Sequence, residues 1–271
     1  MNGGSEPMLT GAHLNVRSLS ANFSEFGNTI LNHNFDLVGV TETWLRADET
    51  FSFEIEEYNF VHNDRTTRGG GTGIYIKKNL HYRVVNLDLN LENTCIILER
   101  GVKRVLFCVI YKPPKVEGRL GTHVLVDDLE NLTMASLPLA DNLIVVGDMN
   151  VNVLEPDSSD SSSYLNSLQT FGLHQLVKKP TRKRALLDHI LTDKPELFKY
   201  TDVLDCHYSD HDMPIFALNG GFTTERTERY ATFRDFTQFS FESFQEELAS
   251  SDLQAIFRIR FEWKNRGHSP I

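Results

Sequence analysis

Polar residues with acid–base or metal-binding side chains recur along this chain at the ends of apolar runs. They are carboxylates, amides, a tyrosine and a histidine: Asn15, Glu42, Tyr111, Asp148, Asn150, Asp188 and His211. Carboxylates can bind a hard divalent cation, and a carboxylate or a histidine can transfer a proton. One such residue carries little information. A series repeated between residues 15 and 211 predicts one site assembled from many strands.

Length and composition are those of a folded chain. The 271 residues suffice for one large domain or two small ones, and the 40% hydrophobic content permits a sizeable core. No apolar stretch approaches the roughly 18 residues of a membrane span. The N-terminal residues MNGGSEPMLT show neither a basic nor an apolar segment, so we expect no secretory signal and no membrane partner.

The three cysteines are scattered and form no C-x-x-C pair. Cys95, Cys108 and Cys206 each lie in or beside an apolar run. We expect buried, reduced thiols and an intracellular protein.

The charge balance is acidic overall and basic in one place. A formal net charge of −10 argues against a protein that coats nucleic acid by net attraction. Local charges can still dominate, because distant ones are screened beyond roughly 8 Å at physiological salt. Residues 178–184, KKPTRKR, are either a solvated loop or a DNA contact; a nuclear-import signal is the weaker interpretation.

The elements that must position the polar series follow from apolar patterning. Helical spacing indicates helices around residues 23–31, 123–137 and 164–171, with a polar loop at 157–163. Strands are expected at residues 13–16, 37–41, 82–88, 94–99, 104–111, 143–148, 186–191 and 213–218. This mixture predicts two mixed sheets packed on each other with helices outside. A composition change places a domain boundary near residue 220.

Two further motifs invite functional interpretations that we reject. Residues 68–73, RGGGTG, precede IYIK rather than a helix, so a turn feeding a strand is expected instead of a phosphate loop. Val126-Asp127-Asp128 vaguely resembles a polymerase metal motif, but nothing else of a polymerase is present. A helix surface is the expected role for it.

The ordered motifs together resemble a known family. LNVRS, TETWL, GGGTGIYIK, IYKPP, GDMN, PTR, LLDHILT and SDHDMPIF follow one another as in the endonuclease/exonuclease/phosphatase superfamily. The closer resemblance is to the endonuclease domain of LINE-type, jockey-like non-LTR retrotransposons. It covers roughly residues 9–219 and implies a DNase I-like fold of the α+β class, a four-layer α/β sandwich. Val146 before Gly147 differs from the inositol phosphatase branch.

The same resemblance divides the chain. Residues 1–219 would form the endonuclease/exonuclease/phosphatase domain. Residues 220–271 resemble a linker that leads to a reverse transcriptase, which is absent here. The resemblance implies DNA as the partner and the nucleus as the location.

The resemblance also implies a metal. Mg²⁺, for which Mn²⁺ can substitute, would neutralise charge on a phosphodiester. Glu42 is the expected ligand, with Asn15 beside it and Asp210 assisting. Sequence alone leaves open a surface or N-cap carboxylate at Glu42 and turn capping at Asn15.

Proton transfer is assigned to Asp148, the second carboxylate in the polar series. Asp148 ends a strand that is expected to be buried, where it can orient or deprotonate the attacking water; a turn-forming aspartate is the alternative. Asn150 points to the same side if the backbone stays extended. Tyr111 can donate its hydroxyl to the phosphate, although a tyrosine that ends an apolar strand is often only the edge of a core.

The resemblance implies that His211 pairs with Asp188, which would raise the pKa of the histidine. Sequence alone leaves His211 as a polar residue at the start of a strand. Thr181, Arg182 and Ser209 are expected to contact phosphates. His189 neighbours Asp188 in sequence but should face the opposite side of the strand.

Three functions are compatible with these residues. The first is a Mg²⁺-dependent endonuclease that leaves a 3′-hydroxyl and a 5′-phosphate, as used to prime reverse transcription. The second keeps the fold and acts on phosphomonoesters or abasic sites. The third is a catalytically silent binding module derived from a retroelement.

Overall fold

The structure is a computed structural model that describes residues 8–46, 53–65, 69–100, 103–114 and 121–219, together with Ser240 and Ser243. The tail 220–271 therefore lies, apart from two serines, outside the described residues, and so does Arg68 of the glycine-rich turn. The domain division stays a prediction.

One mixed sheet holds both ends of the described domain. Its six described strands run in the order β11 (Phe198–Leu204), β12 (Met213–Leu218), β1 (Leu9–Asn15), β2 (Leu37–Thr41), β4 (Thr72–Lys77) and β3 (Tyr58–Asn63). β1 and β2 are parallel, and the other neighbours are antiparallel. A parallel pair needs a crossover, and helix α1 (Leu19–His33) supplies it.

The second sheet repeats this plan. Its described strands are β5 (His81–Val85), β6 (Glu92–Arg100), β7 (Lys103–Tyr111), β8 (Asn142–Asp148), β10 (Asp188–Thr192) and β9 (His174–Gln175). β7 and β8 are the parallel pair, joined by helix α2 (Thr122–Leu139). Helix α3 (Ser159–Thr170) and the short 3₁₀ helix η2 (Pro195–Leu197) complete the described elements.

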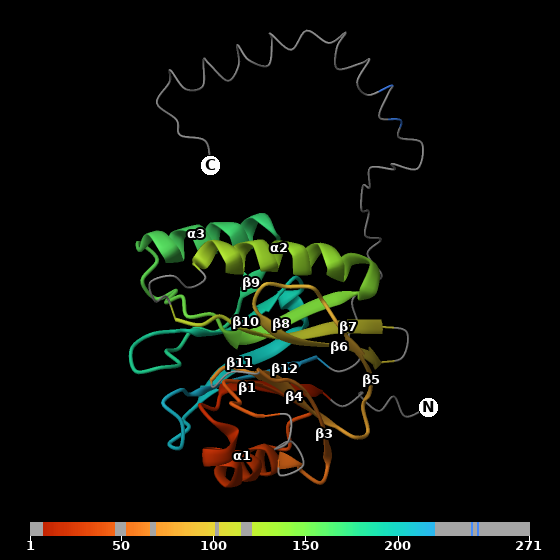
Figure 1. The fold of residues 1–271 in the computed structure, drawn as a ribbon, viewed down its shortest axis with the longest axis vertical. Helices are drawn as coiled ribbons and strands as arrows, with labels where there is room; N and C mark the ends of the chain where they lie inside the picture. Colours follow the sequence, from red (N-terminus) through yellow and green to blue (C-terminus); the bar gives the residue numbers. More distant parts are fainter. Residues whose placement is uncertain are drawn as a thin grey trace. The chain divides into compact units, whose positions relative to one another are not determined.

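The layers stack as helix, sheet, sheet and helices. Figure 1 shows α1 on the outer side of the first sheet and α2 with α3 on the outer side of the second. A core of buried side chains, among them Ile74, Val109, Val146 and Phe216, lies between the sheets. Separate apolar clusters lie beneath α1 and beneath α2 and α3. The expected four-layer α+β sandwich is confirmed.

The sheets approach closely at Gly39 in the middle of β2. A Cβ added there would lie 2.7 Å from Cγ2 of Val109 and 2.8 Å from Cγ2 of Val146. Both contacts are with buried strands of the opposite sheet. The absence of a side chain at Gly39 therefore sets the spacing between β2 and the opposite strands β7 and β8, which end at the predicted site residues Tyr111 and Asp148.

Several predicted boundaries needed correction. Residues 159–163 of the expected polar loop are the first turns of α3, because the hydroxyl of Ser158 accepts a 3.3 Å hydrogen bond from Ser161 N and caps the helix. Strands β3, β9 and β11 were not predicted. β4 follows the glycine-rich turn, as expected, and Gly69 and Gly71 have positive φ.

Asp128 in α2 is fully buried, so its expected place on a helix surface is wrong. Its carboxylate accepts hydrogen bonds from the backbone N and the side chain of Asn90, at 3.0 and 2.8 Å, and from Leu91 N at 2.7 Å. It fastens the segment before β6 to the helix. The spacing of apolar residues does not show that a carboxylate is buried when the cost of its burial is offset by hydrogen bonds from residues far away in sequence.

The three cysteines are buried and free, as expected. Among the helices of the described residues, none combines the length and the apolar character needed to cross a bilayer.

We predict that Gly39→Ala lowers the free energy of unfolding by about 1–3 kcal/mol, because the methyl group overpacks the core between the sheets. Gly27→Ala in α1 is the matched control, since a Cβ there meets nothing within 4 Å. It should be neutral or stabilise by up to about 1 kcal/mol. Urea unfolding compares the two, and equal stabilities would contradict the close approach.

Candidate active site

The predicted site residues lie at one edge of the sandwich because of how the strands run. Asn15 ends β1, and Glu42 follows the parallel strand β2. Tyr111 and Asp148 are register partners at the ends of the parallel strands β7 and β8. Asp188 starts the antiparallel strand β10 opposite Asp148. Both sheets thus deliver their polar residues to the same edge.

The side-chain amide of Asn15 joins the two sheets. Its Nδ2 donates to Glu42 Oε1 and to Asp148 Oδ2, each at 2.9 Å. The Tyr111 hydroxyl donates to the same Glu42 oxygen at 2.9 Å. Asn15 Oδ1 accepts a hydrogen bond from Arg17 N at 3.2 Å. With its oxygen engaged by backbone, Asn15 orients two carboxylates here, and its direct ligation of a metal stays a prediction.

The backbone turns sharply where it leaves these strands. Glu42 and Asn150 have φ of 54° and 46°, a left-handed conformation that costs of the order of 1–3 kcal/mol. The expected extended backbone at Asn150 is therefore wrong. Its backbone N donates to Asp148 Oδ1 at 3.0 Å, and its side chain donates to Lys112 O at 2.8 Å. Its predicted contact with phosphate stays a prediction.

His211 forms a buried pair with Asp188. Nδ1 of His211 lies 2.7 Å from Asp188 Oδ2, and its Nε2 lies 4.0 Å from Asp148 Oδ2. Burial lowers the pKa of His211, but the hydrogen bond and the charge of Asp188 outweigh it and raise the pKa to about 9. The pairing that the resemblance implied is present, and the imidazole is protonated near neutral pH.

Asp148 is buried beside this imidazolium. Burial and the charge of Asp188 raise the pKa of Asp148 to about 7, although His211 and Asn15 act in the opposite direction. A carboxylate poised near neutral pH can accept a proton from water, as a general base requires.

The donor set fits a hard divalent cation. Oxygen or nitrogen atoms of Asp148, Asp188 and His211 lie within 4.8 Å of one another. Asp188 and His211 already bind each other, and both oxygens of Asp148 accept hydrogen bonds, which leaves the carboxylate of Glu42 with a free oxygen for a cation. Glu42 is partly exposed, and within the described residues its Oε2 makes no hydrogen bond. Mg²⁺ prefers one or two carboxylates and keeps several waters, which suits this half-open arrangement.

Comparison with known families decides the identity. A model described as the endonuclease/exonuclease/phosphatase family matches residues 12–211. The chain belongs to this family. Its members are metal-dependent phosphoesterases and nucleases. A comparison with curated protein sequences finds no match.

Solved structures show the same fold at low sequence identity. The endonuclease domain of TRAS1, a telomere-specific non-LTR retrotransposon, has a TM-score of 0.64 at 13% identity, covering 79% of this chain and 99% of that domain. An AP endonuclease from Leishmania major gives 0.63 at 16%, covering 78% and 88%. A 3′ phosphatase from Neisseria, bound to a product DNA hairpin, gives 0.55 at 15%, covering 78% and 99%. The family fold thus serves nucleases and phosphatases.

Sequence analysis missed His13, which also contacts the site. Its Nδ1 lies 3.4 Å from Asp188 Oδ1, and its Nε2 lies 3.2 Å from Thr41 Oγ1. Burial lowers its pKa to about 4, so it is neutral where His211 is charged. Asp188 therefore lies between two histidines. The sequence held a signal for this contact. His13 lies two residues before Asn15, and alternate residues of a strand point to the same face.

His189 faces away from the site, as expected. Its Nδ1 lies 2.9 Å from the Tyr164 hydroxyl of α3, on the outer face of the second sheet.

The hydroxyls predicted to bind phosphate are engaged within the protein. Ser209 Oγ donates to Asn15 O at 2.7 Å and accepts from His211 N at 3.2 Å. Thr181 Oγ1 accepts from Leu187 N and Asp188 N, at 3.1 and 3.0 Å. Both fix the backbone next to the Asp188–His211 pair, and their phosphate contacts stay predictions.

Asp210 is bound by two arginines. Arg182 donates to its Oδ2 at 2.5 Å, and Arg17 Nη1 lies 3.2 Å from the same atom. Burial would raise the pKa of Asp210, but the hydrogen bond and charge of Arg182 lower it. Asp210 thus anchors two cations through Oδ2, while its buried Oδ1 has no hydrogen-bond partner within the described residues. Its predicted assistance to the metal stays a prediction, and Arg17 was not anticipated.

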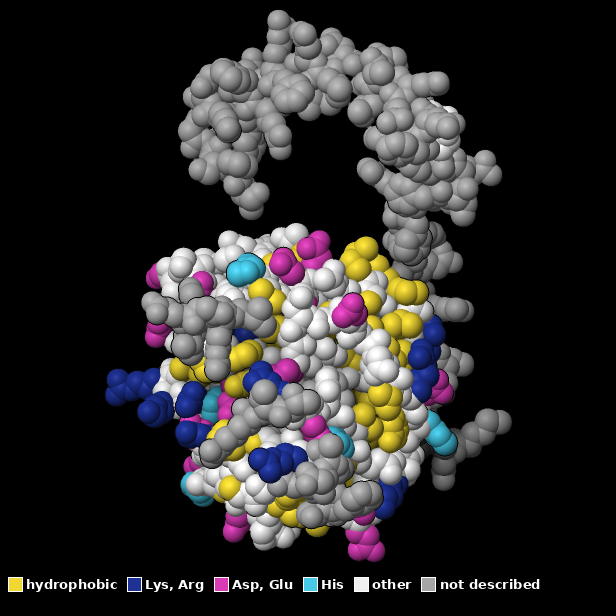
Figure 2. Space-filling view, in the orientation of Figure 1, with side chains coloured by type: hydrophobic (Ala, Val, Ile, Leu, Met, Phe, Trp, Pro, Cys, Tyr) yellow, Lys and Arg dark blue, Asp and Glu magenta, His cyan; other side chains and the backbone are white. Residues whose placement is uncertain are grey.

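Basic side chains surround this edge. Lys178, Lys179, Lys183 and Arg184 are exposed, and the segment that carries them turns back on itself between Arg182 and Ala185. Figure 2 shows one group of lysine and arginine side chains protruding at the left of the described surface, with others near its centre and along its right edge. Lys179 is paired with Asp202 at 2.6 Å.

We predict that the Asp188–His211 pair makes stability fall with rising pH. Because the pKa of His211 is raised in the folded state, its contribution is complete below about 6.5 and is lost as pH rises through about 9. Between pH 7.5 and 9 the native protein should lose about 2 kcal/mol. Urea unfolding in EDTA measures this loss.

His211→Gln should abolish this dependence. His207→Gln is the control, since the His207 side chain is 89% exposed in the same segment, and it should retain the native dependence. Equal slopes in the two variants would contradict the buried ion pair.

Proposed function

We propose that this chain is a divalent-metal-dependent endonuclease that nicks DNA and leaves a 3′-hydroxyl and a 5′-phosphate. One observation carries the proposal: the amide of Asn15 holds Glu42 and Asp148, from opposite sheets, at 2.9 Å each, beside the buried Asp188–His211 pair. A cation donor, a general base and a protonated histidine thus share one edge, which is what phosphodiester hydrolysis requires.

Asp148 acts on the attacking water. Its raised pKa matches proton transfer near neutral pH, and the hydrogen bonds from Asn15 and Asn150 N fix the direction of its oxygens. Since each oxygen is held by a different donor, the carboxylate is oriented before substrate arrives.

His211 stabilises the charge that develops on the phosphate, and the Tyr111 hydroxyl holds the Glu42 carboxylate at 2.9 Å. Asp188 keeps His211 protonated, and Nε2 of His211, which does not bind Asp188, lies 4.0 Å from Asp148 Oδ2. Burial, followed by the charge of Glu42, raises the pKa of the Tyr111 hydroxyl, so it remains a donor. Glu42 would hold a Mg²⁺ or Mn²⁺ ion, which would supply the remaining charge neutralisation when bound.

A polymeric substrate is favoured by the cations beyond the reacting centre. Arg17 and Arg182 lie at the rim, and exposed Lys183 and Arg184 extend the positive surface. A duplex presents successive phosphates to such a surface, whereas a small phosphomonoester would reach only the centre.

The retrotransposon connection extends the proposal. The TRAS1 endonuclease domain shares the fold, and a 3′-hydroxyl at a nick can prime reverse transcription. A reverse transcriptase domain is then the expected partner in a full-length element, and the nucleus is the expected location.

We predict that the purified protein converts supercoiled plasmid to open circle with Mg²⁺ and not with EDTA. Asp148→Asn and His211→Gln should each slow nicking by about 100-fold or more, since each removes a group that acts on the transition state. His207→Gln should retain the native rate. Gel assays of time courses measure the rates.

End-group analysis and a modified substrate complete this test. Nicks sealed by DNA ligase confirm the 3′-hydroxyl and 5′-phosphate. Cleavage confined to an abasic duplex would assign the site to abasic DNA instead. Native-like unfolding and DNA binding without any nicking would favour a silent binding module.

We predict that Lys183→Gln and Arg184→Gln each weaken DNA binding and reduce the slope of log K against log salt by about 1. Lys78→Gln is the matched control, because Lys78 is exposed at the opposite end of β4 from Thr72. It should leave the slope unchanged. Fluorescence anisotropy at several salt concentrations measures the slopes, and three equal slopes would remove the basic segment from the DNA interface.

A further inference from the structure

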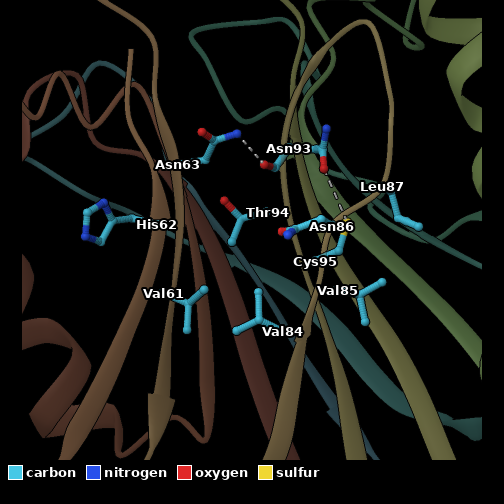
Figure 3. A pocket seen from close by; sticks show the side chains of 10 residues that line it. All are labelled: Val61, His62, Asn63, Val84, Val85, Asn86, Leu87, Asn93, Thr94 and Cys95. Atoms are coloured by element: carbon cyan, nitrogen blue, oxygen red, sulfur yellow. Dashed lines mark hydrogen bonds between the residues drawn. The ribbon is translucent and has the colours of Figure 1, made fainter. Parts of the chain in front are cut away.

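A cavity of about 260 Å³ lies between the two sheets, beside the candidate active site. It is open to solvent and is lined by β3 on one side and by β5, β6 and the residues that follow β5 on the other (Figure 3). β3 and β5 are the edge strands of their sheets on this side. The hydrogen bond between the hydroxyls of Thr72 and Thr94, at 2.8 Å, bridges the sheets next to it.

Strand register places this cavity at the same end of the strands as the candidate active site. Asn63 at the end of β3 pairs with Thr72, which pairs with Thr41, and Glu42 follows directly. Two strand spacings separate β3 from β2, which is about 10 Å. In the other sheet, cavity residue Asn93 follows Glu92, the register partner of Tyr111.

The lining combines apolar surfaces with neutral amides. Val61 and Val84 face each other in Figure 3, and Asn63, Asn86 and Asn93 add their amides around them. The lining contains no aspartate, glutamate, lysine or arginine. His62 also lines the cavity, but its Nδ1 is engaged by Asp64 Oδ1 at 2.9 Å. A phosphate or a metal ion would therefore find no unpaired opposite charge here, and the chemistry favours a neutral ligand with apolar faces and hydrogen-bonding edges.

Two of the three amides are fixed, and the third is free. Asn63 donates to Asn93 O at 3.1 Å, and the Asn93 side chain donates to Leu91 O at 3.0 Å. Asn86 points across the cavity toward Thr94 in Figure 3 and makes no hydrogen bond within the described residues. Asn86 is exposed, so a ligand can hydrogen-bond to its amide by displacing water, without breaking a hydrogen bond within the protein.

Size restricts the ligand further. Pockets for drug-sized ligands span about 300–1,000 Å³, so 260 Å³ suits a single heterocyclic ring system better than a whole cofactor. An asparagine amide binds the edge of a nucleobase in two-point fashion, and adenine is its preferred partner.

We propose that this cavity between the edge strands binds one nucleobase of the DNA substrate and that Asn86 reads its hydrogen-bonding edge. The inference rests on the proposed function and deepens it, because it assigns a source of target selection. Because two strand spacings, about 10 Å, separate β3 from β2 and each base step spans about 3.4 Å, the base lies several positions from the nick.

Nucleoside binding tests the cavity without any nicking. Adenosine, guanosine, cytidine and thymidine are titrated separately into the ¹⁵N-labelled protein, and the side-chain amide resonances of Asn86 and Asn93 are followed. Saturable shifts with at least one nucleoside are expected, and Asn86→Leu should abolish those of Asn93. Asn59→Ala, at the far end of β3 and outside the cavity, should retain them. Absence of saturable shifts with all four nucleosides overturns the proposal.

Sequencing of nick sites on a random-sequence library tests the specificity. The native protein should show a base preference at one position several bases from the nick, and Asn86→Ala should reduce it about 5- to 150-fold, the range for one two-point base contact. Asn59→Ala should keep it. An unchanged profile in Asn86→Ala overturns the assignment even if nucleosides bind. Nucleoside binding by a protein that nicks no DNA would sink the proposed function and leave the cavity assignment standing.

Discussion

The contact on which the site depends is the pair of hydrogen bonds from the Asn15 amide to carboxylates of opposite sheets. Glu42 follows a strand of the first sheet and Asp148 ends a strand of the second. Two carboxylates brought together repel each other, and a neutral double donor between them offsets part of that cost. The separation of the sheets, which Gly39 keeps small, therefore fixes the geometry of the charged groups.

Burial and neighbouring charges set different protonation states for the histidines and aspartates of the site. Each carboxylate oxygen of Asp188 lies near one histidine. His211 is nevertheless protonated, whereas His13 is neutral. The difference arises because His211 forms a short hydrogen bond with Asp188, whereas burial dominates at His13. One carboxylate thus supports two imidazoles in different protonation states, and Asp148 beside them keeps a pKa near neutrality.

Sequence patterning predicted the sandwich and the convergence of its strand ends, because both follow from apolar periodicity and the order of the polar residues. It missed what depends on long-range hydrogen bonding. Asp128 looked like a surface carboxylate, and Asn150 looked extended because a positive φ leaves no mark on its neighbours. The engagement of Asp210 with Arg17 and Arg182 joins segments too far apart in sequence for any local pattern to show.

The pairing of β1 with β12 has a consequence for synthesis. Residues 9–12 take their partners from residues 215–218, so one side of the first strand stays unpaired until almost the whole domain has been made. Contacts of such high sequence separation slow folding and leave strand edges open to wrong partners. A ribosome must therefore release the end of this domain before its beginning can close, and a nascent chain that stops short of β12 cannot complete the first sheet.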